Sequence, residues 1–469
     1  MEAFMPKNIA VSQGHDSSLT PVKTNVRQRI FYGLGDTGYN FLFDMGQLYL
    51  LKYFTDHLGL PSVWAGSVFL VAKVWDAFAD ISVGTWIDNR MNIGPKGKFR
   101  PFIFYSAIPL ALLLVATFSI PNFSLTWKII LAYLSYMIFG TVYSIGNIAY
   151  GSIVPAMTKN SQERTILASF RQAGGTLGLL IATVAFMPIV WLFDNESTGY
   201  LAAVTIFGIA GASLVMLSAK NVEEHYVIKP KEKLSKAVLK KSYGALLKNR
   251  PLLILCVVNV FTFSAYNVKL AIQIFFAQYT LHDTSIIPYM GFFSIGSVFI
   301  GTIIVPNLVK YIDKVWLYII GCVIWAAADL TAFFVVDSPF AFVAFASLAF
   351  LGSSFINTLN WALISDAVEY GEWKTGIRAE GLVYSSYTFF RKLSQAIAGF
   401  VPGIVLAFVG YVPNAEQSEN ALFGIRSLIY IYPGALAILT IVFMYFFYPL
   451  WNDKYKQIIG ELSKRNAEK

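Results

Sequence analysis

The chain has 469 residues, of which 56% are hydrophobic and only 13% are charged, and its formal net charge is +9. Soluble domains carry about a quarter of charged residues, so this composition excludes an ordinary soluble protein and indicates a polytopic membrane protein. Both cysteines, Cys256 and Cys322, lie in apolar runs, which excludes a domain held together by disulfides.

Apolar segments follow one another along the whole chain, separated by short polar turns. Crossing a bilayer as a helix takes about 20 residues, and continuous hydrophobicity is unlike the alternating pattern of a barrel strand. We therefore predict an all-α membrane protein with twelve transmembrane helices. They lie at residues 27–55, 61–88, 101–121, 127–154, 164–192, 199–218, 250–280, 287–311, 316–336, 339–365, 381–411 and 424–449.

The charges predict how these helices are oriented and grouped. Residues 220–250 hold nine Lys or Arg against three Glu, whereas the odd-numbered connections are almost free of basic residues. The positive-inside rule places this linker and both termini in the cytoplasm of a bacterial inner membrane. Topology explains the basic stretch, so no nucleic-acid partner is expected. The expected parts are a cytoplasmic tail (1–26), a six-helix bundle (27–218), a cytoplasmic linker (219–249), a second six-helix bundle (250–449) and a cytoplasmic tail (450–469), which is the layout of the major facilitator fold.

Two carboxylates interrupt the second apolar segment. Asp76 and Asp80 are four residues apart, so they share one face of a helix. Charge inside a membrane is expensive and marks a candidate functional site. A bound Na⁺, with these two residues as metal ligands, or a proton on one carboxyl would relieve their repulsion. A structural ion pair with Lys73 is the alternative.

A polar stripe runs along the first predicted helix and continues onto the fourth. Offsets of 4, 8 and 11 residues keep the stripe on one side of the helix, where it faces a cavity or other helices. Rings that carry hydroxyls, together with amides, suit a sugar, although ordinary polar packing between helices is the alternative. The residues are Asp36, Asn40, Asp44 and Gln47 on the first helix, with Tyr39, Tyr143, Asn147 and Tyr150.

Besides Lys73, three further cations lie deep in apolar segments. Arg171 and Lys392 occupy corresponding helices of the two halves, and Lys269 lies in the seventh with no acid nearby in sequence. Lys269 could contact an anionic ligand, pair with a carboxylate on another helix such as Asp44, or extend its ammonium to the membrane surface. Gln273, one turn on, would point the same way.

Several motifs in the same order resemble the glycoside–pentoside–hexuronide:cation symporter family, of which melibiose permease is a member. They are "YGLGDTGYN", "LVAKVWDAFAD", "GPKGKFRPF", "ERTILASFR" and "DAVEYGEWKTGIRAEG", and the resemblance extends from about residue 27 to 448. Within the family, the chain resembles the branch of enteric bacteria that transports sulfoquinovose.

The resemblance implies roles for individual residues. Asp76, Asp80 and Ser144 fall on positions that bind the coupling cation, but Ala79 replaces an asparagine that helps to bind Na⁺ in melibiose permease. Substrate-site positions of the family correspond to Arg171, Tyr387 and Thr388, and a central lysine near the cation site corresponds to Lys392.

Two departures from the family concern the charge of the substrate. Asn40 and Asn147 stand where melibiose permease uses aspartates to hold sugar hydroxyls, and Lys269 adds a positive charge. These changes favour an anionic sugar, which two carboxylates would repel.

The sequence thus predicts a monomeric secondary transporter of a sugar or glycoside that is coupled to H⁺ or Na⁺, works by alternating access and needs no cofactor. The sugar is expected to be anionic, either a sulfonated sugar of the sulfoquinovose type or a hexuronide. A cation-independent uniporter or exchanger, a carrier of a neutral glycoside or pentoside, and a lipid-handling or sensor protein of the same fold remain alternatives. An enzyme is not expected, because the histidines at 15, 57, 225 and 282 lie in the tail or in loops and no HExxH, GxSxG or phosphate-binding loop occurs.

Overall fold

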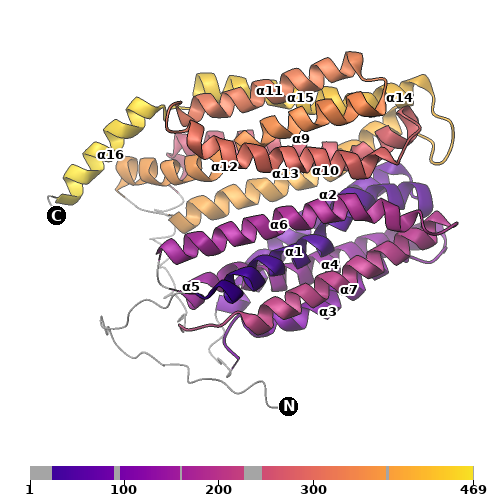
Figure 1. The fold of residues 1–469 in the computed structure, drawn as a ribbon, viewed down its shortest axis with the longest axis horizontal. Helices are drawn as coiled ribbons and strands as arrows, with labels where there is room; N and C mark the ends of the chain where they lie inside the picture. The colour runs from indigo at the N-terminus through magenta and orange to yellow at the C-terminus, as the bar shows by residue number, and fades with distance from the viewer. Residues whose placement is uncertain are drawn as a thin grey trace. The chain divides into compact units, whose positions relative to one another are not determined.

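The computed structural model describes residues 24–88, 96–158, 161–226, 244, 246–376 and 380–467. Within these ranges the chain consists of helices joined by short turns, and it forms no β-strand there. The chain divides into two compact units, one made of residues 1–60 and 71–232 and the other of residues 61–70 and 233–469. Figure 1 shows the helices of both units, coloured along the chain.

The first unit is built around a long opening helix. That helix, α1 (Val26–Lys52), begins with a capping box between Asn25 and Gln28 and continues through the π-helical turn η1 (Tyr53–His57). It packs against α6 and α7, while α3 packs against α4 and α7 (Figure 1). The other helices are α2 (Ser62–Asp88), of which residues 71–88 belong to this unit, α3 (Arg100–Thr117), α4 (Leu125–Ser152), α5 (Val154–Met157), α6 (Ser161–Val190) and α7 (Glu196–Asn221).

Glycines bring α1 and α6 together backbone to backbone. A Cβ atom added at Gly174 would collide with the carbonyl of Gly33, and one added at Gly33 would lie 2.7 Å from the carbonyl oxygen of Phe170. The Thr37 hydroxyl donates a hydrogen bond of 2.8 Å to the Gly174 carbonyl at the same crossing. Small residues permit this close approach of membrane helices, so the pair forms a tight seam in the first unit.

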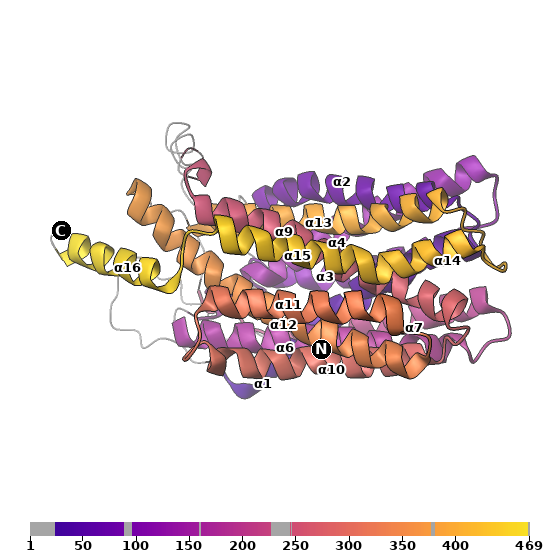
Figure 2. The same ribbon diagram turned by 90° about the horizontal axis from the view of Figure 1, so that it is seen from above.

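The second unit has α9 and α12 at its centre. Helix α9 packs against α13 and α15, which lie side by side with it in Figure 2, and α12 packs against α10 and α11. Much of its apolar core comes from α9, α11 and α12, including Leu255, Cys322 and Leu359. The helices are α9 (Arg250–Phe275) with the π-helical turn η2 (Phe276–Thr280), α10 (Ile286–Leu308), α11 (Lys314–Val335), α12 (Pro339–Thr375), α13 (Glu380–Phe408), α14 (Glu419–Arg426), the π-helical turn η3 (Ser427–Ile431), α15 (Tyr432–Val442), the π-helical turn η4 (Phe443–Phe447) and α16 (Asn452–Ala467).

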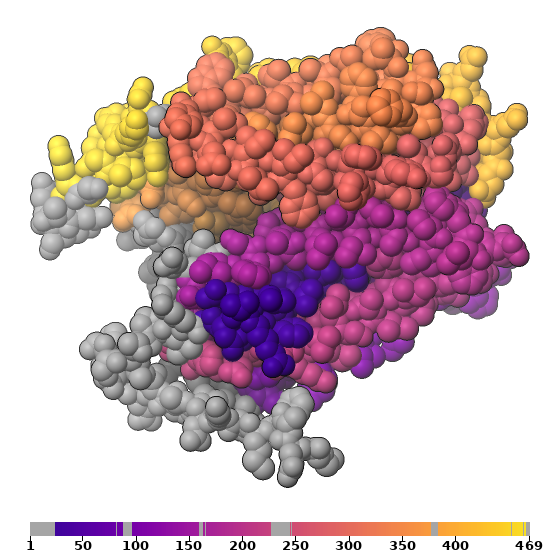
Figure 3. Space-filling model, in the orientation of Figure 1, coloured from indigo at the N-terminus to yellow at the C-terminus, as the bar shows by residue number. Residues whose placement is uncertain are grey.

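The C-terminal segment is a helix rather than an irregular tail. The Trp373 indole on α12 donates a hydrogen bond of 2.6 Å to Glu461 on α16, and the Tyr455 hydroxyl donates one of 2.6 Å to Glu369. In the space-filling view, α16 (yellow) lies beside the end of α12 (Figure 3). These bonds explain why the polar segment after residue 450 is ordered as a helix on the second unit.

Each apolar segment predicted from the sequence coincides with helical structure. Within the described residues, ten helices are long and apolar enough to cross a membrane, so the protein is a multi-pass membrane protein. The remaining two of the twelve predicted segments correspond to α1 and α2, which hold Asp36, Asp44, Asp76 and Asp80 and are not among those ten. The predicted N-terminal tail before residue 24 and linker residues 227–243 and 245 lie outside the described residues.

Candidate functional site

The acidic pair of the first unit lies on α2, opposite α4. The Ser144 hydroxyl on α4 donates a short hydrogen bond of 2.5 Å to Asp80 Oδ1. Asp76 is 6% exposed, and its Oδ2 atom lies 3.2 Å from Lys73 Nζ. Its other carboxylate oxygen, Oδ1, is buried and has no hydrogen-bond partner among the residues that the structure describes. The structure thus brings Asp80 next to Ser144 and leaves one buried oxygen of Asp76 without a hydrogen-bond partner in the described structure.

The Lys73 ammonium next to this pair contacts Asp76 and the rings of two aromatic residues. Its ammonium nitrogen lies 4.7 Å from the ring centroid of Phe43 on α1 and 5.8 Å from that of Tyr136 on α4. Aromatic faces attract cations, so the rings hold the ammonium beside the Asp76 carboxylate. Gln47, from the predicted polar stripe of the first helix, donates a hydrogen bond of 3.3 Å to the Tyr136 hydroxyl. This end of the stripe therefore lies next to the rings that face Lys73.

The other end of the stripe meets Arg171. The Arg171 Nε atom on α6 lies 3.0 Å from Asp36 Oδ1 on α1, and Asn40 Nδ2 donates a bond of 2.7 Å to the carbonyl oxygen of Asp36. The Asp36 side chain is 13% exposed, whereas that of Arg171 is 35% exposed. Arg171 stacks over the Tyr150 ring, with 5.2 Å between its guanidinium carbon and the ring centroid. The guanidinium is therefore oriented by Asp36 and Tyr150, in a side chain that is not fully buried.

Tyrosines of α1 and α4 pack together beside this ion pair. The Tyr150 hydroxyl donates to the carbonyl oxygen of Tyr32, and the two rings stack with 4.7 Å between centroids. The Tyr39 ring meets Tyr143 edge-on at 5.9 Å, and Asn147 Nδ2 donates a bond of 3.1 Å to the Tyr143 hydroxyl. Tyr39 and Tyr150 are 0% and 1% exposed, and the Tyr150 ring lies against the Arg171 guanidinium.

Asp44 lies in the middle of the stripe. It is 8% exposed, and its Oδ2 atom lacks a hydrogen-bond partner within the described part of the chain. Its position on α1, between Asn40 and Gln47, places an unsatisfied buried oxygen between the two ends of the stripe.

Lys269 forms a buried ion pair in the second unit. Its ammonium on α9 contacts Asp329 Oδ1 on α11, and the two side chains are 1% and 0% exposed. The Trp325 indole donates a bond of 2.8 Å to Asp329 Oδ2, and the Tyr430 ring centroid lies 5.6 Å from Lys269 Nζ. Of the alternatives open for Lys269, this geometry favours pairing between helices, with Asp329 rather than Asp44 as the partner.

Sequence reasoning missed Asp329. An aspartate within the apolar run "WAAADLTAFF" was itself the signal, since ionisable residues in membrane segments pair with one another. The other predicted site residues of this unit have local surroundings. Gln273 is 2% exposed on α9, the Thr388 hydroxyl donates to the carbonyl oxygen of Tyr384, and Tyr387 (1% exposed) and half-buried Lys392 lie on α13.

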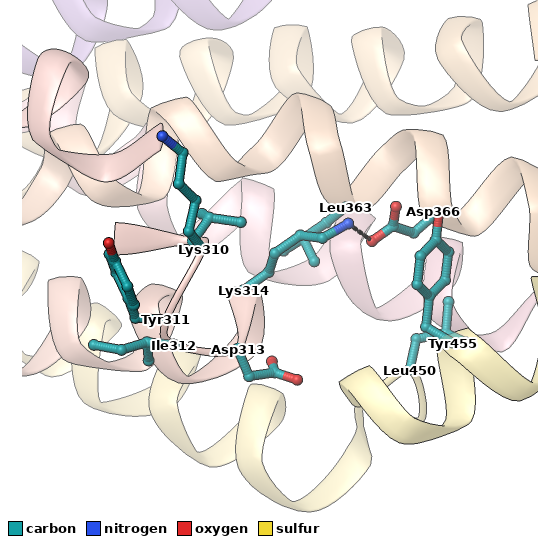
Figure 4. Close-up of a pocket in the computed structure, with 10 residues that line it drawn as sticks. Lys310, Tyr311, Ile312, Asp313, Lys314, Leu363, Asp366, Leu450 and Tyr455 are labelled. Carbon is teal, nitrogen blue, oxygen red and sulfur yellow. Dashed lines mark hydrogen bonds and ion pairs between the residues drawn. The ribbon is translucent and has the colours of Figure 1, made fainter. Parts of the chain in front are cut away.

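A pocket of about 120 Å³ lies at the turn between α10 and α11 (Figure 4). Lys314 Nζ on its wall lies 2.5 Å from Asp366 Oδ2, and Tyr455 of α16 closes one side. None of the residues predicted to bind substrate or cation lines it. The candidate site is therefore formed by the polar side chains on the helices described above and not by this pocket.

Residues 31–452 match the model of a protein family that is described as "MFS/sugar transport protein". The chain belongs to this family of sugar transporters. Its relatives are transporters and not enzymes, and the family resemblance found in the sequence motifs is confirmed.

Two relatives show where within the family this transporter lies. It is 48% identical to an Escherichia coli (strain K12) protein named "Putative sulfoquinovose importer", over 96% of each chain. It is also 48% identical to a Salmonella typhimurium protein named "Putative 2,3-dihydroxypropane-1-sulfonate exporter", over 94% of this chain and 96% of that one. A solved D-xylose-proton symporter shares the fold, with a TM-score of 0.65 at 16% identity over 90% of this transporter and 97% of that chain.

Proposed function

We propose that this sugar transporter carries an anionic sugar, a sulfonated sugar of the sulfoquinovose type or a hexuronide, together with a coupling H⁺ or Na⁺. The observation that carries the coupling is the acidic pair on α2. Asp76 keeps one buried oxygen without a partner in the described structure, and Asp80 accepts from Ser144. A buried acceptor of this kind costs free energy unless a cation or proton reaches it, so cation binding is what the arrangement supports.

Arg171 supports the anionic substrate. Its guanidinium is held by Asp36 and stacked on Tyr150, and the side chain as a whole is about one third exposed. A planar guanidinium binds carboxylates and sulfonates through two parallel hydrogen bonds. Asn40, which bonds to the backbone of Asp36, and Asn147, which bonds to Tyr143, carry amides that can bind hydroxyls without adding negative charge. The two relatives at 48% identity are named for sulfonates, which agrees with this substrate class.

The organisation that we propose follows from charge. Bundles at 27–218 and 250–449 would alternate access to substrate and cation, with both termini and the linker in the cytoplasm of a bacterial inner membrane and the monomer as the working unit. The proposed substrate residues are Gln273, Tyr387, Thr388 and Lys392 in the second unit, in addition to Asp36, Tyr39, Asn40, Asp44, Asn147, Tyr150 and Arg171 in the first.

Uptake by the purified transporter in liposomes tests the proposal. We expect sulfoquinovose to accumulate against its gradient when an inward cation gradient is imposed. Asp76→Asn and Asp80→Asn should lose this accumulation and keep exchange of sulfoquinovose across the membrane, because each change removes a charge from the cation site and leaves Arg171 intact. Asp337→Asn is the matched control, since Asp337 is 80% exposed on the second unit. Accumulation that survives in both variants would refute the cation site.

A further inference from the structure

The acidic pair on α2 already contains a cation of its own. Lys73 is 6% exposed, and its ammonium lies 3.2 Å from Asp76 Oδ2. The rings of Phe43 and Tyr136, from two other helices, face the same ammonium. An ammonium surrounded by a carboxylate and aromatic faces has the contacts by which proteins bind free cations. Here, however, the cation is covalently tethered one turn from the carboxylate that it neutralises.

Two of the four carboxylate oxygens of the acidic pair, Asp76 Oδ2 and Asp80 Oδ1, are already engaged by other side chains. Asp76 Oδ1 is buried and unpartnered in the described structure, Asp80 Oδ1 is engaged by Ser144, and the side chain of Ala79 between them has no oxygen. Hard cations bind through several oxygens at once. A second obstacle is charge, because a metal ion on Asp76 Oδ1 would share one carboxylate with the Lys73 ammonium. At a separation of a few ångströms in a weakly screened site, the repulsion corresponds to roughly a hundredfold in affinity.

We propose that Lys73 is the residue that decides the ion specificity of this transporter: its ammonium pairs with Asp76 of the acidic pair and keeps Na⁺ and Li⁺ out. This inference rests on the proposed function, in which Asp76 and Asp80 form the coupling site. A purely structural Lys73–Asp76 pair would hold α2 in place without affecting which ions bind. The two roles differ in what happens when the ammonium is removed from a folded protein.

The experiment measures binding of Na⁺ itself to the full chain in detergent. Thermal unfolding is followed at equal concentrations of NaCl, LiCl and choline chloride, for the wild type and for Lys73→Met, which keeps the length and removes the charge. We expect the three salts to be equivalent for the wild type. Lys73→Met should gain stabilisation by NaCl over choline chloride, with an affinity for Na⁺ roughly tenfold or more above that of the wild type. Lys73→Arg keeps a cation and should behave as the wild type.

Controls separate charge from fold and this proposal from the previous one. Lys220→Met removes a lysine from the exposed end of α7 and should leave the salts equivalent. Adding Asp76→Asn to Lys73→Met should abolish the gained Na⁺ response, which shows that the ion sits at the acidic pair. Stabilisation of the wild type by NaCl over choline chloride would overturn the role of Lys73 whatever the variants do, and so would a folded Lys73→Met that ignores Na⁺. Both outcomes leave the proposed function standing, because that depends on whether Asp76→Asn still accumulates sulfoquinovose.

Discussion

Neutralising Asp329 should destabilise the second unit, and neutralising Lys269 as well should restore most of the loss. Both side chains are almost completely buried, and each is the charged partner that the other contacts. Removing one member of a buried ion pair leaves an uncompensated charge and costs about 3–5 kcal/mol, whereas a neutral pair of similar volume is nearly equivalent to the original. The pair joins α9 to α11, so this cost falls on the packing of the unit.

The surroundings decide which single change is worse. In Lys269→Met, the Asp329 carboxylate keeps the hydrogen bond of 2.8 Å from Trp325. In Asp329→Asn, the Lys269 ammonium keeps only an amide oxygen and the face of Tyr430. We therefore expect Asp329→Asn near the upper end of that range, at about 4–5 kcal/mol, and Lys269→Met near about 3 kcal/mol. The double variant should lose about 1–2 kcal/mol, because no charge is then left buried.

Reversible unfolding of the purified protein in mixed detergent micelles measures these free energies. Exposed Arg465→Gln on α16 serves as a control for loss of a charge on the same unit. If the double variant loses as much as the sum of the two singles, Lys269 and Asp329 are not energetically coupled and the reasoning is refuted. Binding of sulfoquinovose gives a second readout. A folded double variant that binds sulfoquinovose as the wild type does would exclude direct contact between Lys269 and the sugar.

Two further predictions concern the substrate and the topology. Arg171→Gln should weaken competition by sulfoquinovose by about tenfold or more and leave competition by glucose nearly unchanged, because charged hydrogen bonds contribute about 1.5–3 kcal/mol each; an equal loss for both sugars would contradict an anionic site, and Arg465→Gln should affect neither. Reporter fusions at Lys233 and after Lys469 should report the cytoplasm and one at Asn195 the outside, and an external signal at Lys233 would overturn the twelve-helix topology.

The helices could be predicted because apolar runs of bilayer length have few alternatives. Their ends were harder where contacts between distant residues extend a helix. The tenth segment was expected to end at 365, but α12 continues through a polar stretch to Thr375. Bonds from Trp373 to Glu461 and from Tyr455 to Glu369 tie that stretch to α16. The helix ends only at Gly376, whose φ of 71° suits glycine.

Residue spacing shows which residues share a helix face, but not what that face meets. The i, i+4 rule put Asp76 and Asp80 on one face, and the family resemblance suggested Ser144 beside them. Residue spacing did not reveal the partner of Lys269. The pairing with Asp329 depends on how α11 is rotated against α9, and no local sequence pattern encodes that rotation. Gln47 and Asp36 lie on the same stripe of α1 but bind different helices, because the partner of Gln47 is Tyr136 on α4 and the partner of Asp36 is Arg171 on α6. Residue spacing did not predict this difference, for the same reason.

The seam between α1 and α6 has a practical consequence for measurements of transport. With Gly33 and Gly174 in backbone contact and Thr37 bonded across the crossing, the two helices have little room to slide or turn against each other. We therefore expect two spectroscopic probes, one on each of these helices, to keep a nearly constant separation during transport. Such a pair provides a fixed reference. The distances from a third probe elsewhere in the chain to these two would record which parts of the protein move.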